Sequence, residues 1–331
     1  MNDMNATIET ILTAGKGILA ADESLPTIGK RFSDIHLFST EESRRDYREM
    51  LFTTSGLNEF ISGVILFDET LRQKTKNGVP LSDLLVKQGI VPGIKVDGGA
   101  VALALFNDEK ITQGLDGLRE RLAEYRELGA RFTKWRAVIT IKGNLPTRTC
   151  IEANARMLAL FAALSQEAGL VPIVEPEVLM IGDHSLARCE EVMTLTLERV
   201  FDTLLEHCVA LEHLLLKTGM VLPGKDCPRQ TGIPDIVEST LGCLRRTVPA
   251  TVPGIVFLSG GQSESEATER LHAICKEGAA PWKMSFSFGR ALQDSALKIW
   301  NGSIGNVMDA QTMLFHRAQC NGMAIKGVSI D

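Results

Sequence analysis

Residues 132–178 read FTKWRAVITIKGNLPTRTCIEANARMLALFAALSQEAGLVPIVEPEV, and this stretch decides the fold. Its two ends, 132–139 and 171–178, are short and almost continuously apolar, which is typical of parallel strands buried on both faces. The residues between them, 149–168, carry an apolar helical stripe. That stripe consists of Ile151, Met157, Leu158, Phe161 and Leu164. The stretch therefore predicts a strand, a helix and a second strand, the repeating unit of α/β proteins.

Six further apolar segments of the same kind occur along the rest of the chain. They are residues 17–22, 61–67, 91–96, 214–221, 254–260 and 282–289. Strands that alternate with helices eight times predict an α/β fold, a single (β/α)₈ TIM barrel, with extra N- and C-terminal helices. The alternative, an open doubly wound sheet, would want Gly-x-Gly-x-x-Gly after the first strand, where this chain has Ala-Asp-Glu-Ser. The barrel is therefore favoured.

Local signals predict further helices around these strands. Thr40 is a candidate N-cap, since acids follow it at once, and residues 113–129 form a charged amphipathic pattern closed by Gly129. Residues 195–211 form another apolar stripe, and 311–319 predict a C-terminal helix. No shift in composition marks a linker, so residues 1–331 are expected to form one domain with a short tail from about 321.

Composition narrows the class of protein. The 331 residues are 44% hydrophobic and 23% charged, with Lys plus Arg 35 against Asp plus Glu 41 and a net charge of −6. A mildly acidic chain with 5% aromatics offers no general electrostatic case for nucleic acid or an anionic membrane. No apolar run approaches the ~18 residues of a membrane span. The seven cysteines form no C-x-x-C, and no signal peptide is recognisable, so a cytoplasmic location with reduced thiols is expected.

Charged and polar side chains gather at the predicted strand ends, where barrels of this kind hold their chemistry. They are Asp22, Lys95, Lys134, Arg136, Glu175, Glu177, Lys217, Ser259 and Arg290. Residues two apart on a strand share a face, so Lys134 points with Arg136, and Glu175 with Glu177. The first pair could instead be a solvated pair in a loop, although its apolar neighbours argue against that. The glutamates could provide an acid or base, or only an ion pair with Lys134 or Lys217.

Lys217 follows three leucines and has no charged neighbour in the sequence. Burial disfavours an ammonium and predicts a lowered pKa, which would leave some neutral amine able to form a Schiff base with a carbonyl. The alternative is a lysine that extends from the strand edge to solvent. Spacing alone does not separate these two interpretations.

Two glycine-containing turns after the last two strands favour anion binding. Ser259-Gly260-Gly261 precedes a predicted helix, and Gly289-Arg290 occupies the matching place after the eighth strand. Backbone N–H groups can approach an anion closely there, and these loops commonly hold phosphate in such barrels. None of the six histidines forms H-x-H or H-E-x-x-H, so no metal is expected.

Ten segments of the chain resemble, in the same order, the sequence pattern of one known enzyme family. They are GKGILAADES (15–24), GKRF (29–32), GVILFDETL (63–71), GIKVD (93–97), TQGLDGL (112–118), KWR (134–136), VPIVEPEV (171–178), LLLKTGMV (214–221), FLSGGQSE (257–264) and SFSFGRALQ (285–293). The chain resembles a class I, Schiff-base-forming fructose-1,6-bisphosphate aldolase over nearly its whole length. That resemblance implies reversible cleavage of fructose 1,6-bisphosphate to dihydroxyacetone phosphate and glyceraldehyde 3-phosphate in glycolysis and gluconeogenesis, without a cofactor or metal.

The resemblance also implies residue roles. Lys217 would form the Schiff base, Glu175 would be the acid and base, and Asp22 would hold the hydroxyl that loses its proton, with Lys134 and Glu177 beside them. The phosphate next to the keto carbon would be held by Ser259, Gly260, Gly261, Ser287, Gly289 and Arg290. The far phosphate would be held by Ser24, Thr27, Lys95 and Arg136, with Arg31 near the phosphate sites. A homo-oligomer, by resemblance a tetramer, is also implied.

Two departures from the family pattern are visible. The family's Lys-Val-Asp-Lys-Gly is Lys-Val-Asp-Gly-Gly here, with Gly98 in place of a cation. The chain also ends Gly-Val-Ser-Ile-Asp, where animal members have a terminal tyrosine that exchanges the proton of the enamine; Tyr47 and Tyr125 fall in predicted helices instead. Two other functions stay open: a related barrel that cleaves another sugar phosphate, and a sugar-phosphate sensor that has lost catalysis.

Overall fold

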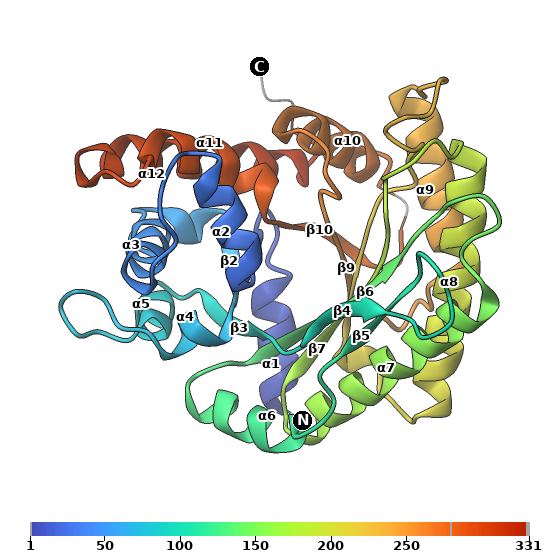
Figure 1. Ribbon diagram of the computed structural model, residues 1–331, viewed down its shortest axis with the longest axis horizontal. Helices are drawn as coiled ribbons and strands as arrows, with labels where there is room; N and C mark the ends of the chain where they lie inside the picture. The colour runs from blue at the N-terminus through green and yellow to red at the C-terminus, as the bar shows by residue number, and fades with distance from the viewer. Residues whose placement is uncertain (1, 279, 329–331) are drawn as a thin grey trace.

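Eight parallel strands close into one barrel in chain order, as the sequence predicts (Figure 1). The structure, a computed structural model, describes residues 2–278 and 280–328. The barrel strands are β1 (Gly17–Ala21), β2 (Ile61–Leu66), β3 (Val91–Lys95), β6 (Phe132–Ile139), β7 (Val171–Val178), β8 (Leu215–Thr218), β9 (Gly254–Phe257) and β10 (Lys283–Phe288). The predicted (β/α)₈ barrel is confirmed.

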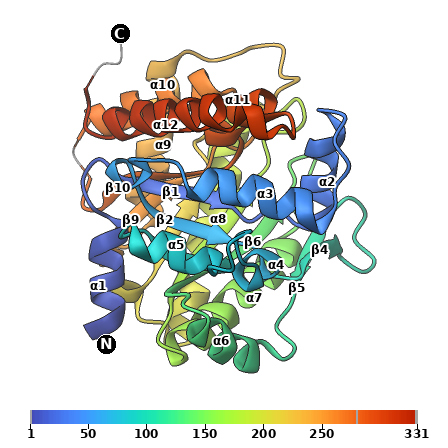
Figure 2. The ribbon, with the colours of Figure 1, turned by 90° about the vertical axis from the view of Figure 1, so that its left-hand side faces the viewer.

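Twelve helices in the described residues surround the barrel or close its end. They are α1 (Asn2–Ile11), α2 (Leu25–Ser33), α3 (Glu41–Phe52), α4 (Asp68–Arg72), α5 (Leu81–Lys87), α6 (Leu118–Glu127), α7 (Arg148–Glu167), α8 (Leu186–Glu206), α9 (Ile233–Thr247), α10 (Glu264–Lys276), α11 (Arg290–Trp300) and α12 (Val307–Ala324). Short 3₁₀ turns are η1 (Leu57–Glu59), η2 (Leu211–His213) and η3 (Ile304–Asn306). Figure 2 shows α10, α11 and α12 packed together on the side of the molecule opposite α6.

Alternation along the strands divides the side chains between two cores. Outward residues such as Trp135 pack under the helices, where its ring stacks on Phe161 at 5.6 Å between centroids. Inward residues such as Phe132, Ile173 and Leu215 fill the barrel together with α1. Gly93 leaves the space that the Phe132 ring occupies, since a Cβ there would lie 2.3 Å from the ring. Close packing of this kind makes the barrel a solid core.

Helix α1 closes the amino-terminal end of the barrel. Its apolar residues Met4, Ile8 and Ile11 belong to the inner core. Leu12, which follows α1, packs against Gly254 at the start of β9, where a Cβ would lie 2.6 Å from the leucine methyl groups. With this end filled by apolar side chains, the charged residues occupy the opposite end, where the strands finish.

Two helix-end predictions are confirmed. The hydroxyl of Thr40 accepts a hydrogen bond from the Ser43 N–H at 3.1 Å, and the Thr40 N–H donates to the Ser43 hydroxyl, a reciprocal cap at the start of α3. Gly129 has φ +101° just after α6, the left-handed backbone that ends many helices.

Several predicted boundaries are wrong. Residues 99–102 and 110–113 form an antiparallel hairpin, β4 (Gly99–Ala102) with β5 (Lys110–Gln113), so α6 begins at Leu118 and not at 113. Helix α8 begins nine residues before the predicted 195 and ends at Glu206, which leaves Leu211 in η2. Helix α12 runs to Ala324, so the tail does not begin at about 321. The last residues of that tail, Ser329, Ile330 and Asp331, lie outside the described residues.

Within the described ranges, no helix combines the length and apolar character needed to cross a bilayer.

Candidate active site

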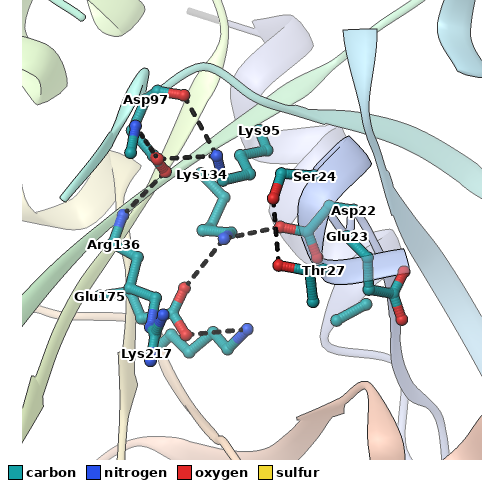
Figure 3. Close-up of polar contacts among 12 residues, drawn as sticks. Asp22, Glu23, Ser24, Thr27, Lys95, Asp97, Lys134, Arg136, Glu175 and Lys217 are labelled. Atoms are coloured by element: carbon teal, nitrogen blue, oxygen red, sulfur yellow. Dashed lines mark hydrogen bonds and ion pairs between the residues drawn. The ribbon is translucent and has the colours of Figure 1, made fainter. Parts of the chain in front are cut away.

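Four charged side chains from four elements form a continuous row of contacts at the carboxyl end of the barrel (Figure 3). Lys134 Nζ of β6 lies 2.6 Å from Asp22 Oδ2, just after β1, and 3.3 Å from Glu175 Oε2 of β7. Glu175 Oε1 lies 3.1 Å from Lys217 Nζ of β8. The sequence predicted all four residues, and parallel strands bring them together because their carboxyl ends meet at one rim.

This row is buried, and its charges stabilise one another. Burial raises the pKa of the Asp22 carboxyl, but the ammonium groups of Lys134 and Lys217 more than offset it, so the pKa falls to about 2. Burial likewise raises the pKa of Glu175, and the same lysines hold it below its usual range. Burial alone would lower the pKa of Lys134. The carboxylates of Asp22 and Glu175 raise this pKa by more than burial lowers it, so Lys134 stays charged.

The alternative interpretations of Lys217 and Lys134 are wrong. Lys217 is 4% exposed and Lys134 is 3% exposed, so neither extends to solvent or lies in a loop. Glu175 is more than the partner of a single ion pair, since it lies between both lysines. Its Oε2 atom is within ion-pair distance of Lys134 but accepts no hydrogen bond from the described residues. A buried carboxylate oxygen without a donor can accept a proton from a ligand.

Two further ion pairs lie at the same rim of the barrel. Arg136 on β6 forms an ion pair with Glu177 on β7, as expected for residues two positions beyond Lys134 and Glu175. Lys95 at the end of β3 lies 2.8 Å from Asp97 Oδ1. Both predicted far-phosphate cations are therefore present at the rim and are held by carboxylates.

The start of α2 contributes Ser24 and Thr27, whose hydroxyls lie 3.0 Å apart beside Asp22 in Figure 3. Arg31, further along α2, forms an ion pair with Glu23 and lies 2.9 Å from Asp294 Oδ1. These contacts place Arg31 in a buried network between α2 and α11. Its predicted part in phosphate binding stays a prediction.

The two glycine-containing turns lie where β9 and β10 end. In the first, the Gln262 N–H donates to the Ser259 carbonyl at 2.9 Å, and Gly260 and Gly261 follow with φ +57° and +92°. After β10, Gly289 is the N-cap of α11 and Arg290 is its first residue. Ser287, 1% exposed, has a hydroxyl that finds no hydrogen-bond partner among the described residues. This combination of donors suits an anion.

Two site residues are missing from the sequence-based prediction. Glu23 directly follows Asp22, so its side chain points away from the barrel interior, where it bonds Arg31 and lies 2.6 Å from Arg48 Nη2. Asp97 accepts from the backbone N–H groups of Arg136 at 3.2 Å and Gly99 at 3.1 Å, besides holding Lys95. An acid one or two residues after a strand-end charge is the signal that could have found both. No three or more His, Cys, Asp or Glu residues in the described ranges are grouped so that they could hold a metal ion.

Known proteins with similar sequences identify the family of this chain. The sequence model of the glycolytic class-I fructose-bisphosphate aldolases matches residues 3–329. The chain belongs to the class I fructose-bisphosphate aldolase family. It is 53% identical to the probable fructose-bisphosphate aldolase class 1 of Xanthomonas campestris pv. campestris over 97% of this chain and 96% of that protein. It is 51% identical to the cytosolic fructose-bisphosphate aldolase 5 of Arabidopsis thaliana over 98% and 91% of the two chains.

A solved aldolase has the same fold. The fructose-bisphosphate aldolase of Plasmodium falciparum, crystallised with TRAP and a small-molecule inhibitor, superposes with a TM-score of 0.98 at 48% identity. The match covers 100% of this chain and 96% of that one.

Gly98, which stands where the family pattern has a lysine, lies against the β4–β5 hairpin in this aldolase. The Gly98 N–H donates to the Gln113 carbonyl at 2.7 Å, which ties the position to the β4–β5 hairpin. A Cβ at residue 98 would lie 3.3 Å from that carbonyl oxygen. Any larger residue at this position would therefore require the hairpin to shift by a few tenths of an ångström.

Proposed function

We propose that this aldolase cleaves fructose 1,6-bisphosphate reversibly to dihydroxyacetone phosphate and glyceraldehyde 3-phosphate, with Lys217 as the Schiff-base lysine. The observation that carries the proposal is the buried contact of Lys217 Nζ with Glu175 Oε1 at 3.1 Å. An amine must lose its proton before it can attack a carbonyl, and an ionised carboxylate within hydrogen-bond distance can accept that proton.

The proposed steps balance within this cluster. Glu175 takes a proton from Lys217, and the neutral amine adds to the keto carbon of the sugar. A proton then moves from that nitrogen to the former keto oxygen, which gives a neutral carbinolamine with a hydroxyl group. Glu175 then returns the proton to the departing hydroxyl, which leaves as water, and a protonated imine remains. Glu175, again a carboxylate, accepts the proton of the hydroxyl on the fourth carbon. The electron pair of the neighbouring carbon–carbon bond moves toward the imine to give an enamine, and the aldehyde departs.

The other charged residues support these steps. Asp22, ionised because of its low pKa, would hold the reacting hydroxyl, and Lys134 would stabilise the negative charge that develops there. Cations at both ends of the site would hold the two phosphates, Arg290 near the keto carbon and Lys95 with Arg136 at the far end. Fixing both ends positions the reacting carbons over Lys217.

A coupled cleavage assay on wild type and Lys217→Met tests the proposal. Wild type should cleave the bisphosphate, and the variant should lose activity to the detection limit. Borohydride added with substrate should attach mass to the peptide that contains Lys217 and not to the one that contains Lys134. The matched control replaces Lys87, an exposed lysine of α5. The Lys87→Met variant should stay active and should still gain mass at the peptide that contains Lys217 when borohydride is added with substrate. Inactivation by borohydride without mass at Lys217 would contradict the mechanism.

The two rival functions predict other outcomes of the same assay. Faster cleavage of another sugar phosphate, such as fructose 1-phosphate, would favour a different substrate. Ligand binding without any turnover would favour a sensor.

A cytoplasmic location, action of residues 1–331 as one domain and a homo-oligomeric assembly also belong to this proposal. The closed single barrel supports the one-domain reading. The cytosolic name of the Arabidopsis relative supports the location. Light scattering would check the expected tetramer.

A further inference from the structure

Two cations from different parts of the chain converge on the turn after β9. A Cβ built at Gly261 would lie 3.3 Å from Lys225 Nζ and 3.5 Å from the Arg290 Nη2 atom. Arg290 begins α11, whereas Lys225 belongs to the loop between β8 and α9. Both side chains are exposed at the mouth of the barrel. Gly261 itself has φ +92°, so the turn keeps an open space between the two positive charges.

The backbone fixes the position of Lys225. Its N–H donates to the Met180 carbonyl at 2.9 Å, and its neighbours Gly224 and Asp226 donate to the carbonyls of His184 at 2.8 Å and Gly182 at 2.9 Å. The loops after β7 and β8 are thus bonded to each other on both sides of Lys225. The approach is so close that a Cβ at Gly224 would lie 2.1 Å from the Gly182 oxygen. These hydrogen bonds therefore hold the backbone of Lys225 in a fixed position.

Neither of these two cations has a close carboxylate partner in the described part of the chain. Within residues 2–278 and 280–328, neither Lys225 nor Arg290 has an acidic oxygen within 4.0 Å, in contrast to Lys95, Lys134 and Arg136. Asp294, one turn further along α11, forms its ion pair with Arg31, and its charge acts on Arg290 only from a longer distance. Two like charges that approach one point repel each other unless an anion lies between them.

The ends of β9 and β10 carry further hydrogen-bond donors without a partner among the described residues. The Ser287 hydroxyl is buried and has no partner in the described part of the chain. No described residue accepts a hydrogen bond from the N–H groups of Gly260 or Gly261. Helix α11, eleven residues long, begins at Arg290 directly after β10, and its positive dipole end favours an anion. The free donors and the two cations all suit a phosphate.

We propose that Lys225 is a phosphate-binding residue of this aldolase, which contributes a second full positive charge opposite Arg290 to the phosphate next to the keto carbon. This inference rests on the proposed function and deepens it. Lys225 lies away from the row of Asp22, Lys134, Glu175 and Lys217. Its charge should therefore strengthen binding of the phosphate in substrate and transition state alike, which changes KM and leaves kcat nearly constant.

The test compares Lys225→Met, which removes the charge, with Lys225→Arg, which keeps it, and with Lys87→Met as a control for loss of one surface charge. KM and kcat are measured for fructose 1-phosphate, which has only the phosphate in question, and inorganic phosphate is titrated as a competitive inhibitor. Lys225→Met should raise KM and the inhibition constant of phosphate by about tenfold, with kcat within about twofold, since a charge-assisted contact is worth about that factor. Lys225→Arg should restore most of the loss.

A readout independent of turnover separates this inference from the proposed function. The dissociation constant of inorganic phosphate is measured by ³¹P NMR on each intact variant. If wild type does not cleave the sugar phosphates but Lys225→Met still binds phosphate about tenfold more weakly than Lys87→Met, the proposed function fails and the role of Lys225 holds. Equal phosphate affinity and equal KM in Lys225→Met and Lys87→Met would overturn the role of Lys225 while leaving the proposed function intact. A kcat loss without any change in KM or phosphate affinity would overturn it as well.

Discussion

Replacement of Lys134 by methionine tests whether the buried row of charges is held together as its geometry indicates. Lys134 is 3% exposed and lies 2.6 Å from Asp22 and 3.3 Å from Glu175. Removing one partner of a buried ion pair leaves an uncompensated charge and costs about 3–5 kcal/mol. With an unfolding entropy of about 2.1 cal/mol/K per residue, that loss lowers the Tm of a chain of this length by about 4–7 °C. Differential scanning calorimetry at one protein concentration measures it.

The size of this loss should depend on pH. In wild type the pKa of Asp22 is about 2 in the fold against 3.8 ordinarily. Asp22 therefore contributes roughly 2 kcal/mol of stability above pH ~4, which is lost as the pH falls toward 2. In Lys134→Met burial remains while the chief attraction is gone, so the pKa of Asp22 should rise above its ordinary value. Protonation of Asp22 then removes the unpaired charge from the variant. The difference in Tm between wild type and Lys134→Met should therefore shrink as the pH falls from 7 to 4.

A double-mutant cycle supplies the control. Asp22→Asn removes the carboxylate that Lys134→Met leaves unpaired, so the double variant should be more stable than the sum of the two single losses predicts, by about 2 kcal/mol. Strict additivity, together with a Tm deficit that stays constant from pH 7 to pH 4, would refute the reasoning that Lys134 acts through Asp22.

Three further changes test other parts of the structure. Gly93→Ala should cost about 1–3 kcal/mol because its Cβ would lie 2.3 Å from the buried Phe132 ring, and Gly63→Ala, 3.3 Å from that ring, should cost less; equal Tm values would contradict this packing. Thr40→Ala should cost about 1 kcal/mol through loss of the α3 cap, whereas exposed Thr312→Ala should cost under half of that in the same melting experiment. Asp97→Asn weakens the hold on Lys95 and should raise KM for fructose 1,6-bisphosphate more than for fructose 1-phosphate; equal effects on both substrates would argue against a far-phosphate role of Lys95.

The barrel could be predicted because its strands carry a strong local signal. Buried parallel strands such as β6 and β7 are almost continuously apolar apart from the charged residues of the site, and their predicted bounds match the structure residue for residue. The β4–β5 hairpin gives no such signal, since its strands have four residues each and are largely exposed. Its connection bends at Leu105 and Asp108, which have positive φ without being glycine. Turn chemistry that relies on glycine does not reveal such a loop.

The centre of the site could be predicted for a related reason. A residue at a strand end has a fixed direction, so Lys134, Glu175 and Lys217 are placed by alternation and by barrel closure alone. Lys225 has no comparable local signal. Its position depends on hydrogen bonds between two loops some forty residues apart in the chain, and its side chain meets Gly261 from a third loop. Contacts between loops are non-local, so a single sequence does not disclose them.

The same strands that fill the barrel also supply its charges, and this explains how the fold tolerates four buried ionised groups. Below the rim the inward residues are apolar, Ile173 on β7 and Leu215 on β8, and two positions later the same faces carry Glu175 and Lys217. Asp22 and Glu175 balance Lys134 and Lys217, so the row has no net charge, and each group has an opposite charge within 3.3 Å. Schiff-base formation replaces the Lys217 ammonium with a protonated imine, which carries the same single positive charge. The proposed covalent step therefore leaves the charge balance of the buried row unchanged, which avoids the desolvation cost that a new buried charge would bring.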